Sequence, residues 1–203
     1  MDHRLPIDFF RREDVVQISK DLLGMHMLTQ FDGQLTSGRI VETEAYRGTD
    51  DKACHAYGGR RTKRTEVMYY EAGHAYVYLC YGIHHLFNIV CSSEGTANVV
   101  LIRAIEPLDG IDVMLQRRAK SKLQRSLTAG PGALSKALGI TTNFTGLNMF
   151  QPNSPIWLEY GTQADPKSEI IASPRVGIAY AEECIDWPWR FRLKDSKWTS
   201  PAK

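Results

Sequence analysis

The chain has 203 residues, of which 43% are hydrophobic and 24% charged, and its formal net charge at pH 7 is +2. This length and composition predict one globular domain, residues 1–203, with a sizeable core. The small net charge excludes a basic field over the whole molecule, so binding to nucleic acid would depend on local clusters of charge.

The first elements are expected to be a helix and a β-hairpin. Apolar residues recur at helical spacing over residues 12–23, and Gly24 is placed as the C-terminal stop. Residues 26–31 and 34–46 flank Asp32-Gly33, a dipeptide that favours the positive φ angles of a tight turn. We therefore expect two antiparallel strands here.

The remaining elements alternate between long polar segments and short regular ones. Residues 47–73 are polar and glycine-rich and predict a long functional loop, and residues 141–168 predict an excursion over the surface. Helices are expected at residues 109–118 and 131–138. Further strands are expected at residues 75–81, 86–92, 98–105, 156–159, 169–173, 175–179 and 190–193.

The sequence shows no sign of secretion, membrane insertion or a metal framework. The N-terminus is charged and lacks an apolar signal segment, and no apolar run is long enough to span a bilayer. The spacing of the four cysteines, Cys54, Cys80, Cys91 and Cys184, matches no zinc finger or disulfide framework. We therefore expect a cytosolic protein without a membrane partner, a metal or a cofactor.

Two carboxylates and a tyrosine alternate along the strand at 34–46. Alternation places Glu42, Glu44 and Tyr46 on one face, where adjacent acids are poor packing material unless paired or put to use. Glu44 is the candidate general base, since a carboxylate near a bound water can take its proton as the water attacks carbon. The alternative is an ion pair with Arg103, which interrupts an apolar strand, and Glu42 is the weaker candidate.

Aromatic and basic side chains follow further along the chain. Tyr76 and Tyr78 share a strand face and with Tyr46 could stack on a flat base, although we expect Tyr76 to belong to the core. Tyr81 precedes Gly82, where the chain turns, and could wedge between base pairs. His55 could hydrogen-bond a base edge, or simply face solvent. Basic side chains cluster at residues 60–64 and 117–125, although such runs are usually solvated faces.

Other motifs carry less weight. Gly130-Pro131-Gly132 precedes a helix and could aim backbone amides at a phosphate, although an ordinary helix start is the default interpretation. His84 and His85 are adjacent, so on a strand they point to opposite faces and predict no metal site. Phosphate-binding and dinucleotide-binding fingerprints are absent from the sequence.

Taken together, several of these motifs closely resemble the alkyladenine DNA glycosylase family, also called 3-methyladenine DNA glycosylases. The likeness spans nearly the whole chain, and the order and spacing of its motifs are specific. It is carried by Val-Glu-Thr-Glu-Ala-Tyr at 41–46, His-Ala-Tyr-Gly-Gly-Arg at 55–60, Tyr-Val-Tyr at 76–78, Tyr81-Gly82 with Asn88, Leu-Ile-Arg-Ala-Ile-Glu-Pro at 101–107, Gly130-Pro131 with Leu134 and Ala137-Leu138, and Arg-Val-Gly at 175–177.

The resemblance implies a fold and a set of residue roles. The fold would be a monomeric, single-domain, mixed α/β structure on a curved antiparallel sheet, similar to the C-terminal domain of methionyl-tRNA formyltransferase. Glu44 would activate water, with Arg103 and the Val176 carbonyl helping to hold it. The flipped purine would be enclosed by Tyr46, His55 and Tyr78, with Asn88 excluding normal guanine, and DNA would be contacted by Arg60, Thr62, Arg64, Tyr81 and Ile83.

The implied function is excision of damaged purines from double-stranded DNA. The substrates would be 3-methyladenine, 7-methylguanine, hypoxanthine and ethenoadenine, flipped out of the stack before water attacks the anomeric carbon. Because Glu44 and not a lysine occupies the catalytic position, the resemblance implies a monofunctional hydrolase without strand cleavage. The location would be the nucleoid in a bacterium or the nucleus in a eukaryote.

One departure and two alternatives accompany this resemblance. Ala133 stands where the family usually has a lysine, so a phosphate contact could be lost, with Lys136 one turn later as its replacement. A non-catalytic module that binds damaged DNA or RNA could use the same basic loop and tyrosine wedge. A nucleosidase acting on free nucleosides could use a similar pocket but would need neither the basic loop at 60–64 nor the Tyr81 wedge.

Overall fold

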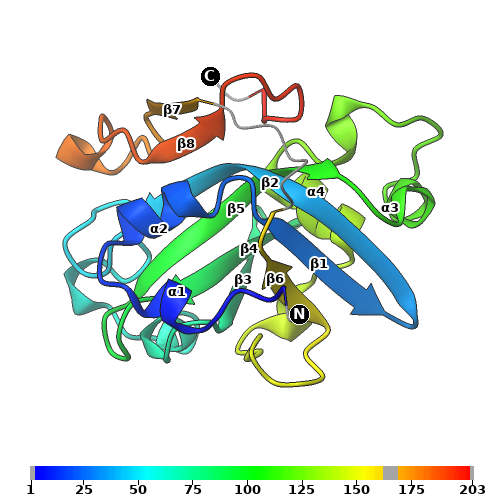
Figure 1. The fold of residues 1–203 in the computed structure, drawn as a ribbon. Coiled ribbons are helices and arrows are strands. Elements are labelled where there is room, and N and C mark those ends of the chain that lie inside the picture. Colours follow the sequence, from blue (N-terminus) through cyan, green and yellow to red (C-terminus); the bar gives the residue numbers. More distant parts are fainter. Residues whose placement is uncertain (1–2, 162–168, 202–203) are drawn as a thin grey trace.

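A computed structural model describes residues 3–161 and 169–201 of the chain and shows a mixed α/β fold with few helices (Figure 1). Its eight strands form one open antiparallel sheet. The strands are β1 (His26–Phe31), β2 (Gln34–Tyr46), β3 (Ala75–Cys80), β4 (His84–Cys91), β5 (Asn98–Pro107), β6 (Ile156–Glu159), β7 (Ile170–Ser173) and β8 (Arg190–Leu193). The α-helices are α1 (Asp8–Arg11), α2 (Val15–Asp21), α3 (Ile111–Arg117) and α4 (Pro131–Leu138).

The long strand β2 is the centre of the sheet. The main path of hydrogen-bonded strands is β3-β4-β5-β2-β1-β6, and β8 adds a branch that pairs with β2 on one side and β7 on the other. Along one edge of β2, its first half pairs with β1 and its second half with β8. Figure 1 shows β7 and β8 lying apart from β3 and β4 as a result.

The predicted hairpin between β1 and β2 is confirmed. Asp32 has a φ of 52° and Gly33 a φ of 76°, the pair of positive values that the two central residues of a type I′ turn require. The register then pairs Phe31 with Gln34 and His26 with Arg39. Local turn chemistry therefore sets the position of the strand that carries the two glutamates.

The two faces of the sheet are used differently. Val41 and Ala45 of β2 and Val100, Ile102 and Ala104 of β5 are buried in the main apolar core, which also takes residues of α1 and α2. In Figure 1 these two helices cross the near face of the sheet. The intervening residues of β2 and β5 belong to the other face, which is therefore available for polar chemistry.

The predicted loop at 47–73 has structure of its own. It contains two 3₁₀ helices, Tyr57–Gly59 and Glu66–Tyr69, and no strand. Five of its residues are buried in a second, smaller apolar cluster: Cys54, Ala56, Val67, Met68 and Tyr69. The loop is thus anchored to the sheet by a small core beneath its basic tip.

One predicted element is wrong, and one observed helix was not predicted. No strand forms at 175–179. Gly177 has a φ of 75°, which is not an extended conformation, and the Arg175 side chain points inward to pair with the buried Asp51. Helix α1 was not predicted, since four residues are too few to show a helical period. The predicted excursion at 141–168 contains β6 and ends partly outside the described residues.

The remaining predicted elements are present with small shifts of their ends. The opening helix is shorter than predicted because Asp14 caps it, accepting a hydrogen bond from the Gln17 N–H at 2.9 Å. Strand β4 begins at His84 and strand β5 extends to Pro107. Within the described ranges, no helix combines the length and apolar character that crossing a membrane requires.

Candidate active site

A cavity of ≈ 400 Å³ opens on the polar face of the sheet. Alternation along β2, β3, β4 and β5 directs every second side chain into it. The loop after β2, the start of α4 with the residues before it, and the loop after β7 complete the wall. The strands contribute Tyr46, Tyr76, Tyr78, Cys80, His84, Leu86, Asn88, Val99, Leu101 and Arg103, and other segments contribute residues 53–55, Met68, Tyr81, residues 129–133, residues 176–178 and Tyr180. This size suits a flat heterocycle.

Glu44 is held rigidly beside this cavity. Its Oε1 accepts a hydrogen bond from the backbone N–H of Val176 at 2.8 Å, and its Oε2 accepts one from the Tyr46 hydroxyl at 2.8 Å. The Arg103 guanidinium lies 3.2 Å from the same Oε2. Glu44 is fully buried, while Tyr46, Arg103 and Val176 all line the cavity, so its carboxylate lies one layer behind the wall.

Arg103 is shared between the two glutamates of β2. Its Nε donates to Glu42 at 2.9 Å while a terminal nitrogen faces Glu44. The β2–β5 ladder shifts register on both sides of Glu42, and such a bulge re-aims side chains next to it. Burial alone would lower the pKa of Arg103, but the charges of Glu44 and Glu42 raise it above its usual value. Glu42 does not line the cavity.

Val176 contacts Glu44 through its amide, although the resemblance assigns a role to its carbonyl. The neighbouring Arg175 fixes this backbone: it forms an ion pair with Asp51 and donates a hydrogen bond to the Ala45 carbonyl at 2.9 Å. Its guanidinium also lies 4.7 Å from the centre of the Tyr46 ring. Arg175 therefore ties the loop after β7 to the strand that carries Glu44.

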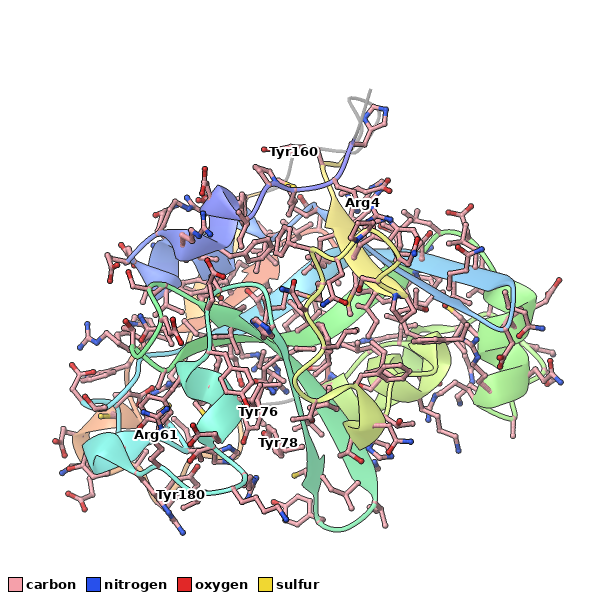
Figure 2. The ribbon with its side chains drawn as sticks, turned by 90° about the horizontal axis from the view of Figure 1, so that it is seen from below. Arg4, Arg61, Tyr76, Tyr78, Tyr160 and Tyr180 are labelled. Atoms are coloured by element: carbon pink, nitrogen blue, oxygen red, sulfur yellow. The ribbon has the colours of Figure 1, made fainter. Side chains whose placement is uncertain are left out.

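Aromatic rings form the walls of the cavity. Figure 2 shows Tyr76 and Tyr78 side by side, and their ring centres are 5.5 Å apart. The ring of His55 meets that of Tyr78 edge-on at 4.7 Å. Burial raises the pKa of Tyr46 and Tyr78, and that of Tyr76 to about 12, so all three hydroxyls stay protonated at neutral pH.

His55 is neutral and its tautomer is defined by its partners. Burial, together with the charges of Arg64 and Arg60, lowers its pKa to about 4. Arg64 lies 3.3 Å from Nε2, and because a guanidinium only donates, Nε2 must accept. The proton is then on Nδ1, which lies 2.8 Å from the Tyr76 hydroxyl. Tyr76 is buried as predicted, but it also positions this histidine.

Asn88 and Tyr81, both of the β3–β4 hairpin, also line the cavity. The Nδ2 of Asn88 donates to the carbonyls of Tyr76 and Leu86 at 3.1 and 3.3 Å, which leaves Oδ1 as the acceptor. At the tip, Tyr81 is 88% exposed and Ile83 71% exposed. Positive φ values at Tyr81 and Gly82, 50° and 73°, make the turn that projects them.

The basic loop is exposed beside the cavity. Arg60, Thr62 and Arg64 line a second cavity of ≈ 350 Å³ that shares His55 with the first. Arg64 also lies 4.9 Å from the centre of the Tyr78 ring, so it connects the loop to the aromatic wall. Arg61, by contrast, is paired with Glu66 at 2.8 Å.

The sequence did not single out some residues that complete the site. Tyr180 lines both cavities, and its hydroxyl donates to the Ala53 carbonyl at 3.3 Å. No local pattern marks it, since it lies in a loop about 130 positions from its partner. Among the residues that the structure describes, no three histidine, cysteine or acidic side chains gather as metal ligands would.

Known proteins resemble this chain over most of its length. The model of the methylpurine-DNA glycosylase (MPG) family matches residues 8–197. A protein of Chlamydia felis named "Putative 3-methyladenine DNA glycosylase" is 47% identical, over 95% of this chain and 97% of its own. Proteins of the same name from Bacillus cereus and Desulfitobacterium hafniense are 46% and 43% identical, covering 94% and 97% of this chain and 96% and 98% of their own. The chain belongs to the methylpurine-DNA glycosylase family and is a hydrolase of N-glycosyl bonds.

Proposed function

We propose that the chain excises alkylated or deaminated purines from double-stranded DNA as a monofunctional glycosylase with Glu44 as its base. The observation that carries this proposal is the anchoring of Glu44 by Val176, Tyr46 and Arg103 behind an aromatic cavity. Three donors converging on one buried carboxylate compensate its lost hydration and fix its position, and a carboxylate so held can take a proton from water.

The geometry of Glu44 suggests where the nucleophilic water binds. A carboxylate oxygen has two lone pairs, and Oε1 uses one of them for the Val176 N–H. The nucleophilic water would donate a hydrogen bond to the second lone pair of Oε1, next to Val176, which lines the cavity. Its negative charge also stabilises the oxocarbenium character that develops as the glycosidic bond breaks.

The cavity supports recognition of a flipped purine. Tyr46 and Tyr78 offer ring faces for stacking, and His55, as the Nδ1–H tautomer, offers an acceptor at Nε2 once Arg64 moves aside. Asn88 Oδ1 and the cavity walls would reject guanine by collision with its exocyclic amine. Tyr81 and Ile83 at the exposed tip would fill the gap in the duplex.

The substrate classes differ in what they demand. 3-Methyladenine and 7-methylguanine are cationic and leave readily, whereas hypoxanthine and ethenoadenine are neutral and must gain a proton as they depart. Where a lesion weakens base pairing, the free energy needed to flip it is lower. A Schiff base with strand cleavage is not part of the proposal, since Glu44 stands at the catalytic position.

The proposal extends to the whole chain. One glycosylase domain would span residues 1–203, act as a monomer and resemble the C-terminal domain of methionyl-tRNA formyltransferase, in keeping with its open antiparallel sheet. Its working place would be on chromosomal DNA, in the nucleoid of a bacterium or the nucleus of a eukaryote. The convergence on Glu44 argues against a non-catalytic binding module, which would gain nothing from burying this acid.

The test is base release from a duplex containing one hypoxanthine or ethenoadenine, measured by alkaline cleavage for the parent and Glu44→Gln. Loss of a general base lowers the rate by about 10²–10⁴-fold. Glu106→Gln is the matched control, since Glu106 of β5 is also paired with an arginine, Arg39 of β2, and neither of these two side chains lines the cavity. Binding without release by the parent, on these duplexes and on methylated DNA, would favour the binding module.

A further inference from the structure

The C-terminal segment, residues 194–201, reaches the buried side of the candidate site. Its Trp198 is 6% and its Ser200 3% exposed, although both lie within six residues of the chain end. The Nε of Arg125 donates to the Thr199 carbonyl at 2.7 Å and holds the segment in place. The segment thereby brings Ser200 into hydrogen-bond contact with Glu42.

Ser200 and Arg190 converge on one carboxylate. Glu42 Oε1 accepts hydrogen bonds from Ser200 Oγ at 2.8 Å and from Arg190 Nε at 2.8 Å. Glu42 Oε2 accepts the backbone N–H of Ser200. Glu42 is fully buried, so these donors compensate the loss of its hydration.

We propose that Ser200 and Arg190 are positioning residues that, through Glu42, fix Arg103 against the candidate base Glu44. The inference deepens the proposed function and rests on it. Neither residue lines the cavity, so neither touches substrate in this arrangement. Their effect would pass through side chains that do.

The physical basis is the shared guanidinium of Arg103. Its Nε is bound to Glu42 at 2.9 Å, and a guanidinium is planar and rigid, so fixing Nε also fixes the terminal nitrogen that lies 3.2 Å from Glu44. Two carboxylates and two guanidiniums balance in charge here, and Arg190 Nε and Ser200 Oγ donate to the same Glu42 oxygen, Oε1, that Arg103 Nε contacts. Arg103 is therefore left free to serve both glutamates.

Strand β8 provides the second half of this arrangement. It pairs with β2 only along the catalytic stretch, with Arg190 opposite Glu44 and Arg192 opposite Glu42. A carboxylate satisfied only by Arg103 would draw that guanidinium toward itself and away from Glu44. The branch of the sheet at β8 and the C-terminal segment thus prevent competition between the two acids.

Removing the Ser200 hydroxyl should therefore alter the base and not the binding of DNA. In Ser200→Ala, Glu42 loses one donor and pulls Arg103 closer, so Glu44 loses part of the cationic neighbour that favours a charged carboxylate. The acid limb of the pH–rate profile should move to higher pH, and the single-turnover rate at neutral pH should fall on the order of tenfold. Affinity for lesion DNA should not change.

A second variant predicts the opposite shift. Glu42→Gln removes the like charge near Glu44 and releases Arg103 to it, so the acid limb of the pH–rate profile should move to lower pH. Ser196→Ala is the matched control for Ser200→Ala. Ser196 lies in the same segment, and its Oγ accepts the Trp198 N–H at 3.2 Å without contacting Glu42.

The experiment measures single-turnover base release from a hypoxanthine duplex between pH 5 and 8 for the parent and the three variants, with melting temperature and duplex affinity. Opposite shifts in the two Glu42-linked variants, with Ser196→Ala like the parent, support the inference. An active parent with unshifted profiles in Ser200→Ala and Glu42→Gln overturns it, even if stability falls. A parent without activity on any lesion overturns the proposed function instead, and the inference with it.

Discussion

Glu44 and Val176 are 132 positions apart in the chain, yet the backbone N–H of Val176 lies 2.8 Å from Glu44 Oε1. A backbone donor cannot be removed by changing its own side chain, so the contact depends on how the loop after β7 is held. Arg175 holds it through Asp51, Ala45 and the Tyr46 ring. The stability of that loop and the geometry of the candidate base are therefore coupled.

The first prediction concerns the Arg175–Asp51 ion pair, in which both side chains are fully buried. Asp51→Asn leaves Arg175 buried without a charged partner and should lower the free energy of unfolding by about 3–5 kcal/mol. Asp50→Asn is the control, because Asp50 forms an exposed pair with Arg47 whose loss should matter by about 0–1 kcal/mol. Urea unfolding of both variants checks the difference, and equal losses would contradict it.

The second prediction concerns the pH dependence of stability. Since the pKa of His55 is lowered from 6.5 to about 4, the folded state excludes a proton that the unfolded state binds. The stabilisation is complete above pH 6.5 and is lost as the pH falls toward 4. The melting temperature should therefore fall over this window, and less steeply in His55→Asn. His3→Gln, at an exposed histidine that lines neither cavity, is the matched control.

The third prediction concerns Tyr81 at the hairpin tip. Tyr81→Asn removes the ring but tolerates the positive φ of 50°, so the turn and the melting temperature should be retained. Base release from duplex DNA should fall, because no side chain would fill the gap left by the flipped nucleotide. Tyr160→Ala is the control: Tyr160 is 47% exposed, and Figure 2 places it at the opposite end of the molecule from Tyr78. Equal release by Tyr81→Asn and the parent would refute the wedge.

The fourth prediction compares two adjacent arginines of the basic loop. Arg60 forms no ion pair among the described residues, whereas Arg61 is neutralised by Glu66 at 2.8 Å. Arg60→Gln should weaken DNA binding and reduce the slope of log K against log salt by about 0.9, the value for one phosphate contact. Arg61→Gln should change the slope much less. Fluorescence anisotropy across a salt series measures both, and a reversed order would show that Arg61 leaves Glu66 to bind DNA.

The sequence predicted the local half of this site. Alternation predicted one face of β2 for Glu42, Glu44 and Tyr46 and one face of β3 for its two tyrosines, because a regular strand has a period of two. The bulge at Glu42 departs from that period. The Asp32-Gly33 turn fixed the register of β2, because its positive φ angles are a property of those two residues. The sequence left open whether Arg103 pairs with Glu44. The structure shows that Arg103 contacts both Glu44 and Glu42.

Only the tertiary structure decided what surrounds Glu44. The pairing of β8 with β2, the Val176 amide, and the arrival of Ser200 at Glu42 join residues 132 to 158 positions apart. The strand expected at 175–179 does not form for the same reason, since the direction of the Arg175 side chain is set by its ion pair with Asp51, which is distant in the sequence, and not by neighbouring residues. Periodicity records short-range geometry, whereas the partners of a buried charge are set by how the whole chain packs, and no local pattern carries that information.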